Sequence, residues 1–329
     1  MGRGTWTRRL VTTLICVAMA AAGCSDSSVP PTTSEAHTVR VGMFPAGSTL
    51  PVHVAVEKGI FERHGLHVEI TDGQDLPLFM AALSKGQYDI VMSGPTLVLI
   101  GAEKGLDLQV ISSLQRSSQQ RPNAVWITRD HAIGALEQLQ GKTIGVPSLT
   151  GIIVDATKYL LNKRGVGEGA VKFFQTPFPT MGDQLAAGHI DAAVASIPFN
   201  EVIAARGFRV HTDIVAEAVS EASDGAVQTA MTSIWVSSST FTREHPDTVR
   251  AWRDAMREAV AYLDGNEFEA RAMMHDWLKI PTPILEKSPL PDWDTEITPA
   301  EILPYIAISK AVGSTTSDPD VDTLVWHGP

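Results

Sequence analysis

The sequence lacks a surplus of positive charge, and it lacks long apolar runs beyond its N-terminal segment. Its 329 residues include 26 Lys and Arg against 37 Asp and Glu, and the formal net charge of −11 argues against a nucleic-acid partner. After the N-terminal segment, no apolar run reaches the ~20 residues that a membrane-spanning helix needs. With 44% hydrophobic and 19% charged residues, the chain has a globular composition, and its length favours two lobes.

Residue patterns for catalysis and metal binding are also missing. The ten histidines form no ligand cluster, and there is no Gly-x-Ser-x-Gly elbow for a nucleophilic serine. Residues 141–143, Gly-Lys-Thr, look like part of a phosphate-binding loop, but position 136, where that loop needs glycine, is leucine. The tripeptide also precedes an apolar run instead of following a strand. We therefore expect a protein that is not an enzyme and has no cofactor and no metal site.

The first 24 residues have the order of an export signal. Arg3, Arg8 and Arg9 precede an apolar run at residues 10–22, and Gly23 and Cys24 follow. Residues 21–24, Ala-Ala-Gly-Cys, resemble the bacterial lipobox, although alanine stands where leucine is usual. The resemblance implies cleavage before Cys24 and a diacylglycerol on its thiol. Export by general secretion is favoured over the twin-arginine route, because the residues after Arg9 match the twin-arginine signal incompletely.

We assign residues 1–23 to a lipoprotein signal peptide and residues 24–37, which are rich in Ser, Thr and Pro, to a flexible tether. Cys16 would leave with the signal, so the exported protein needs no disulfide. The expected location is the cell envelope, either anchored by lipid on the outer face of the cytoplasmic membrane or in the periplasm.

From residue 39 onward, short apolar runs alternate with segments of helical periodicity, which indicates βαβ units and a mostly parallel sheet. The segment that begins at Leu83, LSKGQYDIVMSGP, can be laid on the one that begins at Leu185, LAAGHIDAAVASIP. Pro45 and Pro147 share the same offset of 102 positions, as do Asp89 and Asp191. This internal repeat predicts two similar lobes, with both aspartates in architectural roles.

After residue 212 the sequence reads as a polar stretch, followed by a strand near Trp235. A long helix then begins near Pro246 and ends at Gly265, with an apolar stripe that we assign to the core. Further helices are expected over residues 266–313.

Four segments in order carry a family resemblance. They are VRVGMFPAGSTLPVHVAVEKGIFERHGLHVEI, GQYDIVMSG, LQGKTIGVP and SIWVSSSTFTREHPDTVRAW, which together span roughly residues 39–278. The chain resembles nitrate-, sulfonate- and taurine-type substrate-binding lipoproteins of ABC importers, and also binding proteins for pyrimidine precursors of thiamine.

This resemblance implies an α/β type II periplasmic binding protein fold, in which two crossover strands join two lobes around a ligand cleft. The segments near Trp126 and Trp235 fit the two crossings. Lobe 1 is expected to comprise residues 38–127 plus 233–329, and lobe 2 residues 128–232.

Ligands of open α/β sheets lie beyond the carboxyl ends of the strands, against helix N-termini that favour negative groups. The loops at those positions contain no Lys or Arg, so a monoanion or a neutral solute fits better than a multiply charged anion. Each Ser or Thr there also fits a simple helix cap, and each aromatic residue also fits the core. Arg116 and Arg121 belong either to the cleft mouth or to a solvated loop. The expected ligand-binding residues are Phe44, Ser48, Thr49, Ser93, Gly94, Thr96, Ser112, Ser148, Thr150, Gly151, Met181, Ser196, Pro198 and Trp235.

The leading hypothesis is a monomeric extracytoplasmic receptor that captures a small solute by lobe closure and delivers it to an ABC permease and its ATPase. A sulfonate, taurine-like or nitrate-like anion and a pyrimidine-type precursor all remain open as ligands. One alternative is an enzyme that resembles a pyridoxal-phosphate-dependent pyrimidine-precursor synthase. Another is a sensory binding domain without a transporter.

Overall fold

The computed structural model describes residues 37–328. The predicted signal peptide, Cys24 and the predicted tether up to residue 36 lie outside the described residues. His37, the last residue assigned to the tether, belongs to the first strand. Within the described part of the chain, no helix is both long and apolar enough to cross a membrane.

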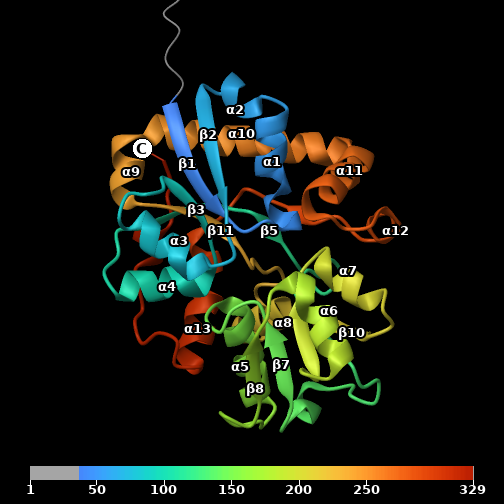
Figure 1. Cartoon of the computed structure of the whole chain (residues 1–329). Coiled ribbons are helices and arrows are strands. Elements are labelled where there is room, and N and C mark those ends of the chain that lie inside the picture. The colour runs from blue at the N-terminus through green and yellow to red at the C-terminus, as the bar shows by residue number, and fades with distance from the viewer. Residues whose placement is uncertain (1–36, 329) are drawn as a thin grey trace, which may run out of the picture. The chain divides into compact units, whose positions relative to one another are not determined.

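The first sheet has five strands in the order β2-β1-β3-β11-β4. Strands β1, β2 and β3 run parallel, whereas β11 is antiparallel to both of its neighbours. In Figure 1, the blue strands β1 and β2 lie in the upper part of the molecule, beside α1 and α10. The strands are β1 (His37–Met43), β2 (Leu66–Asp72), β3 (Ile90–Ser93), β4 (Gln109–Ser113) and β11 (Ile234–Ser237).

The second sheet repeats this arrangement with the order β8-β7-β9-β6-β10. Strands β7, β8 and β9 are parallel, and β6 and β10 complete the sheet in antiparallel pairings. In each sheet, therefore, the fourth strand is supplied by a segment that follows a crossing from the other lobe, as the type II fold requires. The strands are β6 (Val125–Thr128), β7 (Thr143–Val146), β8 (Lys172–Gln175), β9 (Ala192–Ala195) and β10 (Arg209–Asp213).

Asp89 and Asp191 hold equivalent positions in the two sheets. The carboxylate of Asp89 accepts a hydrogen bond from the backbone N of Arg40 at 2.8 Å, while its own N donates to the Arg40 carbonyl at 2.9 Å. Asp191 makes the same two bonds with Thr143, at 3.0 and 2.8 Å. Asp89 thus fastens the start of β3 to β1, and Asp191 fastens the start of β9 to β7, which confirms that the repeat is architectural.

Helices cover both sheets, and the predicted long helix is α10 (Pro246–Gly265). Its Trp252 is fully buried and stacks on Phe61 at 5.0 Å between ring centroids. The core assignment of the apolar stripe is therefore confirmed. The remaining helices are α1 (Leu50–Glu57), α2 (Ile60–Arg63), α3 (Leu76–Leu83), α4 (Pro95–Glu103), α5 (Ile152–Lys163), α6 (Phe178–Ala187), α7 (Phe199–Ala204), α8 (Ile214–Ala222), α9 (Ser239–Glu244), α11 (Glu267–Leu278), α12 (Thr282–Leu285), α13 (Leu303–Ala311) and α14 (Val321–Leu324).

The stretch after residue 212, which the sequence analysis describes only as polar, contains the helix α8 from Ile214 to Ala222. Asp213 caps this helix: its Oδ1 accepts hydrogen bonds from the backbone N of Val215 at 3.0 Å and of Ala216 at 2.8 Å. Its Oδ2 accepts from the N of Asn123 at 2.7 Å and of Ala124 at 3.0 Å. One buried carboxylate thus starts α8 and fixes the entry to β6.

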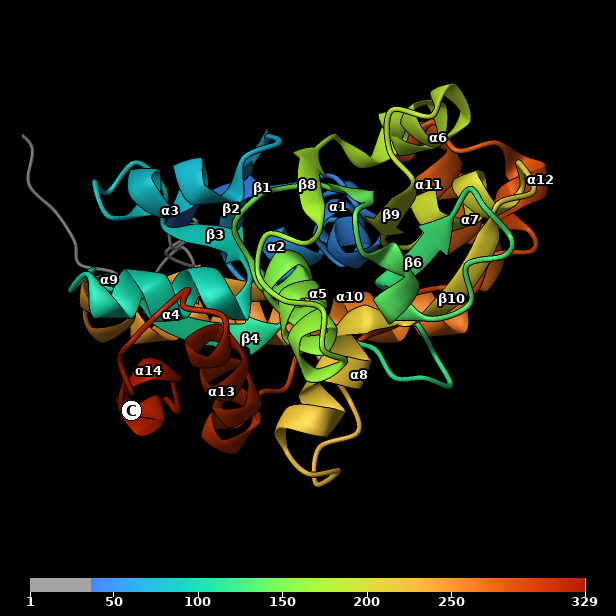
Figure 2. The ribbon, with the colours of Figure 1, turned by 90° about the horizontal axis from the view of Figure 1, so that it is seen from below.

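Part of the segment that follows β11 packs against the second lobe. Helix α13 packs against α4 of the first lobe and against α5 and α8 of the second, as Figure 2 shows for the red helix. Further back along the chain, the two-residue strand β12 (Asp292–Trp293) pairs with β5 (Gln115–Arg116), which lies on the first crossing. The residue division into lobes given above stays a prediction, but the C-terminal segment contacts helices of both lobes.

Candidate functional site

A cavity with an empty volume of about 910 Å³, including its solvent-open part, is bordered by residues of both lobes. It lies beyond the carboxyl ends of β1, β3, β7 and β9, where the topology of an open α/β sheet places a ligand. The bordering residues are Phe44, Ala46, Ser48, Gln74, Asp75, Leu76, Pro77, Met92, Gly94, Leu97, Gln115, Asn123, Pro147, Ser148, Thr150, Gly151, Ile152, Ile153, Val154, Gln175, Phe178, Ser196, Ile197, Thr232 and Ser233.

The loop after β1 forms one wall of the cavity and is held tightly. Thr49 lies inside this loop, and its Oγ1 is 2.9 Å from the Phe44 carbonyl oxygen and 3.0 Å from that of Ala46. Trp293 donates its indole N–H to the Gly47 carbonyl at 2.9 Å. A Cβ at Gly47 would lie only 3.1 Å from the carbonyl oxygen of Ile197 in the other lobe. Glycine therefore permits the loop after β1 and the loop after β9 to approach each other at this point.

The N-terminus of α5 forms the opposing wall. Gly151 precedes the helix with a φ of +128°, a conformation that side-chain-bearing residues rarely adopt. Ile152, Ile153 and Val154 supply the first backbone N–H groups of this helix, and none of these residues is proline. Because those amides lack partners within the helix, this end of the cavity favours a hydrogen-bond acceptor or a partial negative charge on the ligand.

Phenylalanine rings from both lobes meet at the cavity. Phe44 of the first lobe and Phe178 of the second are arranged edge to face, with ring centroids 5.8 Å apart. Phe178 also stacks on Phe199 at 5.6 Å, so its orientation is fixed from behind. Together with Leu76, Leu97 and the isoleucines of α5, these rings give the cavity an apolar body.

Amide and hydroxyl groups at the two crossings form the polar floor. Asn123, just before β6, donates from Nδ2 to the Oγ1 of Thr232, just before β11, at 3.1 Å, and its Oδ1 accepts from the Ile197 N at 3.2 Å. Gln115 donates from Nε2 to the same Thr232 oxygen at 3.4 Å. Ser117 and Ala230 exchange two backbone hydrogen bonds of 2.8 Å between the crossings. The floor of the cavity is therefore built on the hinge itself.

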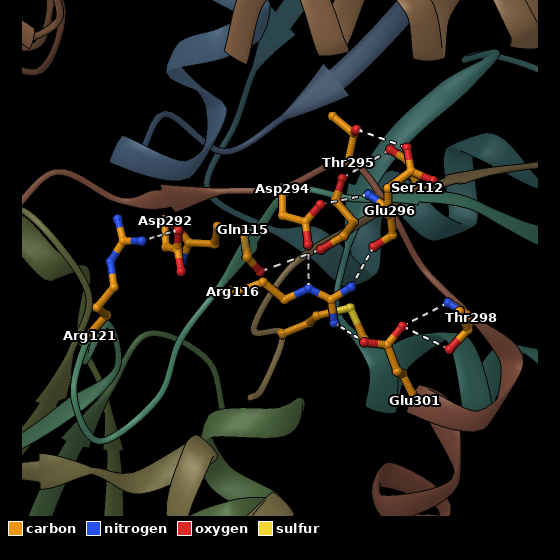
Figure 3. A network of polar contacts seen from close by, with 12 residues as sticks. Ser112, Gln115, Arg116, Arg121, Asp292, Asp294, Thr295, Glu296, Thr298 and Glu301 are labelled. Carbon is orange, nitrogen blue, oxygen red and sulfur yellow. Dashed lines mark hydrogen bonds and ion pairs between the residues drawn. The ribbon is translucent and has the colours of Figure 1, made fainter. Parts of the chain in front are cut away.

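The described residues that border the cavity include no cationic side chain. Among the described residues that border it, Asp75 is the one ionisable group, and its carboxylate caps α3 by accepting from the Leu78 N at 3.0 Å. Arg116 is engaged elsewhere: its Nε lies 2.6 Å from Asp294, its Nη2 donates to the Glu296 carbonyl at 2.7 Å, and it pairs with Glu301. Figure 3 shows this network, and it also shows Arg121 paired with Asp292.

These ion pairs show where each arginine lies relative to the cleft mouth and the solvated loop considered above. The side chain of Arg116 is only 13% exposed and is surrounded by acidic partners, so it belongs neither to a solvated loop nor to the ligand cleft. The side chain of Arg121 is 62% exposed and pairs with Asp292 at 2.6 Å. Neither arginine borders the cavity between the lobes.

A second polar cluster joins the lobes behind the cavity. Asp155 of α5 is 2% exposed and accepts hydrogen bonds from Thr96 of α4 at 3.1 Å, from Ser309 of α13 at 3.0 Å and from Ser314 at 2.7 Å. Burial raises the pKa of Asp155 above its ordinary value, although the hydrogen bonds from these three hydroxyls act in the opposite direction. This cluster, which we call the Asp155 latch, links both lobes and the C-terminal segment.

The structure brings only part of the predicted site to the cavity. The residues that border it are Phe44, Ser48, Gly94, Ser148, Thr150, Gly151 and Ser196. Whether they contact a ligand stays a prediction.

The other expected ligand residues do not border the cavity. Thr49 shapes its own loop, Thr96 belongs to the Asp155 latch, and the hydroxyl of Ser112 donates to the Ser113 carbonyl. Met181 and Trp235 are buried core residues, and Trp235 packs edge to face on Trp252. Ser93 is fully buried, and neither Ser93 nor Pro198 borders the cavity.

Sequence reasoning missed the amide side chains Gln74, Gln115, Asn123 and Gln175, as well as Thr232 and Ser233. Asn123 and Thr232 immediately precede the two predicted crossing strands, and that position was a usable signal. Gln115 had no such signal, because its place depends on the pairing of β5 with a segment far along the chain.

Comparison with known proteins gives a consistent assignment. The family model described as NMT1/THI5 like matches residues 47–270. A protein of Brucella abortus, provisionally named a binding protein, is 23% identical over 233 residues, which is 71% of this chain and 69% of that protein. Among solved structures, the alkanesulfonate-binding protein SsuA from Xanthomonas axonopodis pv. citri, bound to MOPS, has a TM-score of 0.70 at 14% identity, covering 89% of this chain and 99% of its own.

The periplasmic nitrate-binding protein NrtA from Synechocystis PCC 6803 has the same TM-score of 0.70, at 13% identity, with 88% of this chain and 86% of that chain covered. These structural likenesses establish the periplasmic binding protein fold with two α/β lobes.

Proposed function

Because the chain belongs to the NMT1/THI5-like family, we propose that it is an extracytoplasmic solute-binding protein of an ABC importer. It captures one small organic solute between its lobes and presents the closed form to a membrane permease. The observation that carries this proposal is a cavity bordered by loops of both lobes, with its polar floor on the two crossings. A solute in that cavity stabilises the closed arrangement by contacting loops of both lobes.

The chemistry of the residues that line the cavity narrows the range of possible solutes. The described lining residues offer no Lys, Arg or His to neutralise a strong anion, whereas the N-terminus of α5 favours an acceptor group. The apolar walls around Phe44 and Phe178 suit a carbon body. We therefore propose a neutral solute, a zwitterion or a monoanion with an apolar portion, and we place a small inorganic anion such as nitrate below an organic ligand.

The same proposal extends to the partners and the location. An ABC permease and its ATPase would receive the solute, and lipid on Cys24 would hold a monomeric protein at the outer face of the cytoplasmic membrane. The alternative of a synthase that uses pyridoxal phosphate needs a lysine at its cofactor, and the lining residues include none among the described part of the chain. No observation therefore favours that alternative.

Thermal unfolding in the presence of candidate solutes tests the proposed function. We expect at least one member of a panel of taurine, alkanesulfonates, nitrate and aminopyrimidines to raise the unfolding temperature. A ligand at 100 times its dissociation constant stabilises the folded protein by ~2.7 kcal/mol. If no member of the panel shifted the transition at millimolar concentration, the proposed range of solutes would be wrong.

A further inference from the structure

Gln115 borders the cavity between the lobes, and its amide oxygen is buried without a hydrogen-bond partner among the described residues. The Gln115 residue is 3% exposed, and its Oε1 is buried with no partner among residues 37–328. Buried polar groups in folded proteins are nearly always paired, so an orphaned acceptor beside a cavity indicates a missing donor. The Nε2 of the same amide donates to the Oγ1 of Thr232 at 3.4 Å, so the oxygen is the unpaired end of a side chain that borders the cavity.

The position of Gln115 is fixed by the backbone on both sides. Gln115 lies opposite Trp293 in the β5–β12 pair, and its carbonyl oxygen accepts from the Ser113 hydroxyl at 3.4 Å. The neighbouring Arg116 is tied to the acidic network drawn in Figure 3. The side chain therefore reaches the cavity from a rigid ladder at the first crossing, which suits a group that selects a ligand.

None of the donors among residues 37–328 pairs with this oxygen. Asn123 directs its Nδ2 to Thr232, and its own oxygen is taken by the Ile197 N, so its orientation is set. No Lys, Arg or His is present among the described lining residues. A donor group on the molecule that occupies the cavity would supply the missing partner.

We propose that Gln115 is a specificity-determining residue, whose Oε1 accepts a hydrogen bond from an N–H or O–H group of the solute. The inference rests on the proposed function and deepens it: the solute carries a donor at the hinge end and an acceptor toward the N-terminus of α5. Solutes that present only acceptors and carbon, such as simple alkanesulfonates, leave the buried oxygen unpaired and bind more weakly.

Two matched pairs of probes test this selection, because each pair replaces an amine by a methyl group of similar size. The pairs are taurine with 1-propanesulfonate, and 4-aminopyrimidine with 4-methylpyrimidine. For any pair that binds, we expect calorimetric titration of the wild type to favour the amine by 10-fold or more. Gln115→Met should remove this preference, and Gln175→Met, at an exposed amide on the cavity rim, should retain it. Equal affinity for both members, or a preference that survives in Gln115→Met, would overturn the inference.

The ligand-free protein supplies a readout that does not depend on the panel. Since Gln115→Met removes an unpaired buried acceptor and only one long hydrogen bond, its unfolding midpoint without ligand should equal or exceed that of the wild type. A clearly lower midpoint would show that the amide has a structural role and would contradict the inference. If no probe bound the wild type, the proposed range of solutes would fail, while this midpoint would still decide the role of Gln115.

Discussion

Replacing Arg116 by methionine is expected to lower the free energy of unfolding by about 3 kcal/mol, because two partly buried carboxylates lose their cation. Arg116 lies between Asp294 and Glu301, which are 32% and 22% exposed, and it also donates to the Glu296 carbonyl. Methionine retains much of the aliphatic volume but none of the charge. The measurement is equilibrium unfolding in urea at neutral pH.

Arg121 provides the matched control for this prediction. Its side chain is 62% exposed and pairs with Asp292 on the surface, so Arg121→Met should change the free energy of unfolding by less than about 1 kcal/mol. Equal effects of the two substitutions would mean that Arg116 is as solvated as Arg121. The account of the network at the first crossing would then be incorrect.

The Asp155 latch gives the second large effect. Asp155→Ala should lower the free energy of unfolding by about 3 kcal/mol, because the hydroxyls of Thr96, Ser309 and Ser314 lose their common acceptor in a buried place. Asp155→Asn keeps an acceptor oxygen and adds a donor that a hydroxyl can accept, so it should cost less than about 1 kcal/mol. Urea unfolding of the two variants separates these outcomes, and equal losses would contradict the proposed pairing.

The wild type and Asp155→Asn should also differ in the pH dependence of their stability. The pKa of Asp155 is raised by burial in the folded protein, so ionisation of this carboxyl opposes folding. Its contribution is fully present below the ordinary pKa of 3.8 and is lost as the pH rises through the higher folded value. The stability of the wild type relative to Asp155→Asn should therefore be greatest in acid and decline toward neutral pH. A difference that grew with pH would contradict this sign.

Periodicity and repetition predicted the fold because they reflect contacts that recur along the chain. Asp89 and Asp191 lie at the repeat offset because Asp89 fastens β3 to β1 and Asp191 fastens β9 to β7. The apolar stripe of α10 is visible because one face of a long helix meets the core. Helix α8 escaped notice because its start depends on Asp213, whose capping role is hidden within a polar segment.

The site was less predictable because loops bury their polar side chains in ways that depend on distant partners. Thr49 and Thr96 lie in the expected loops, but hydrogen bonds to Phe44 and Asp155 turn their hydroxyls away from the cavity. The partner of Arg116 in the network, Asp294, stands 178 positions away in the sequence. Gln115 reaches the cavity through a ladder with an equally remote segment. No local pattern contains such information.

The central claim, that a solute is held in the cavity between the lobes, is tested most directly by filling that cavity. Ser148 borders the cavity on the loop before α5, whereas its neighbour Leu149 is 50% exposed and does not border it. Ser148→Trp and Leu149→Trp therefore place the same large ring on the two sides of one loop. The measurement is calorimetric titration of both variants with the solute that stabilises the wild type. The account predicts that Ser148→Trp loses binding by 100-fold or more while Leu149→Trp binds like the wild type. Undiminished binding by a folded Ser148→Trp variant would contradict it.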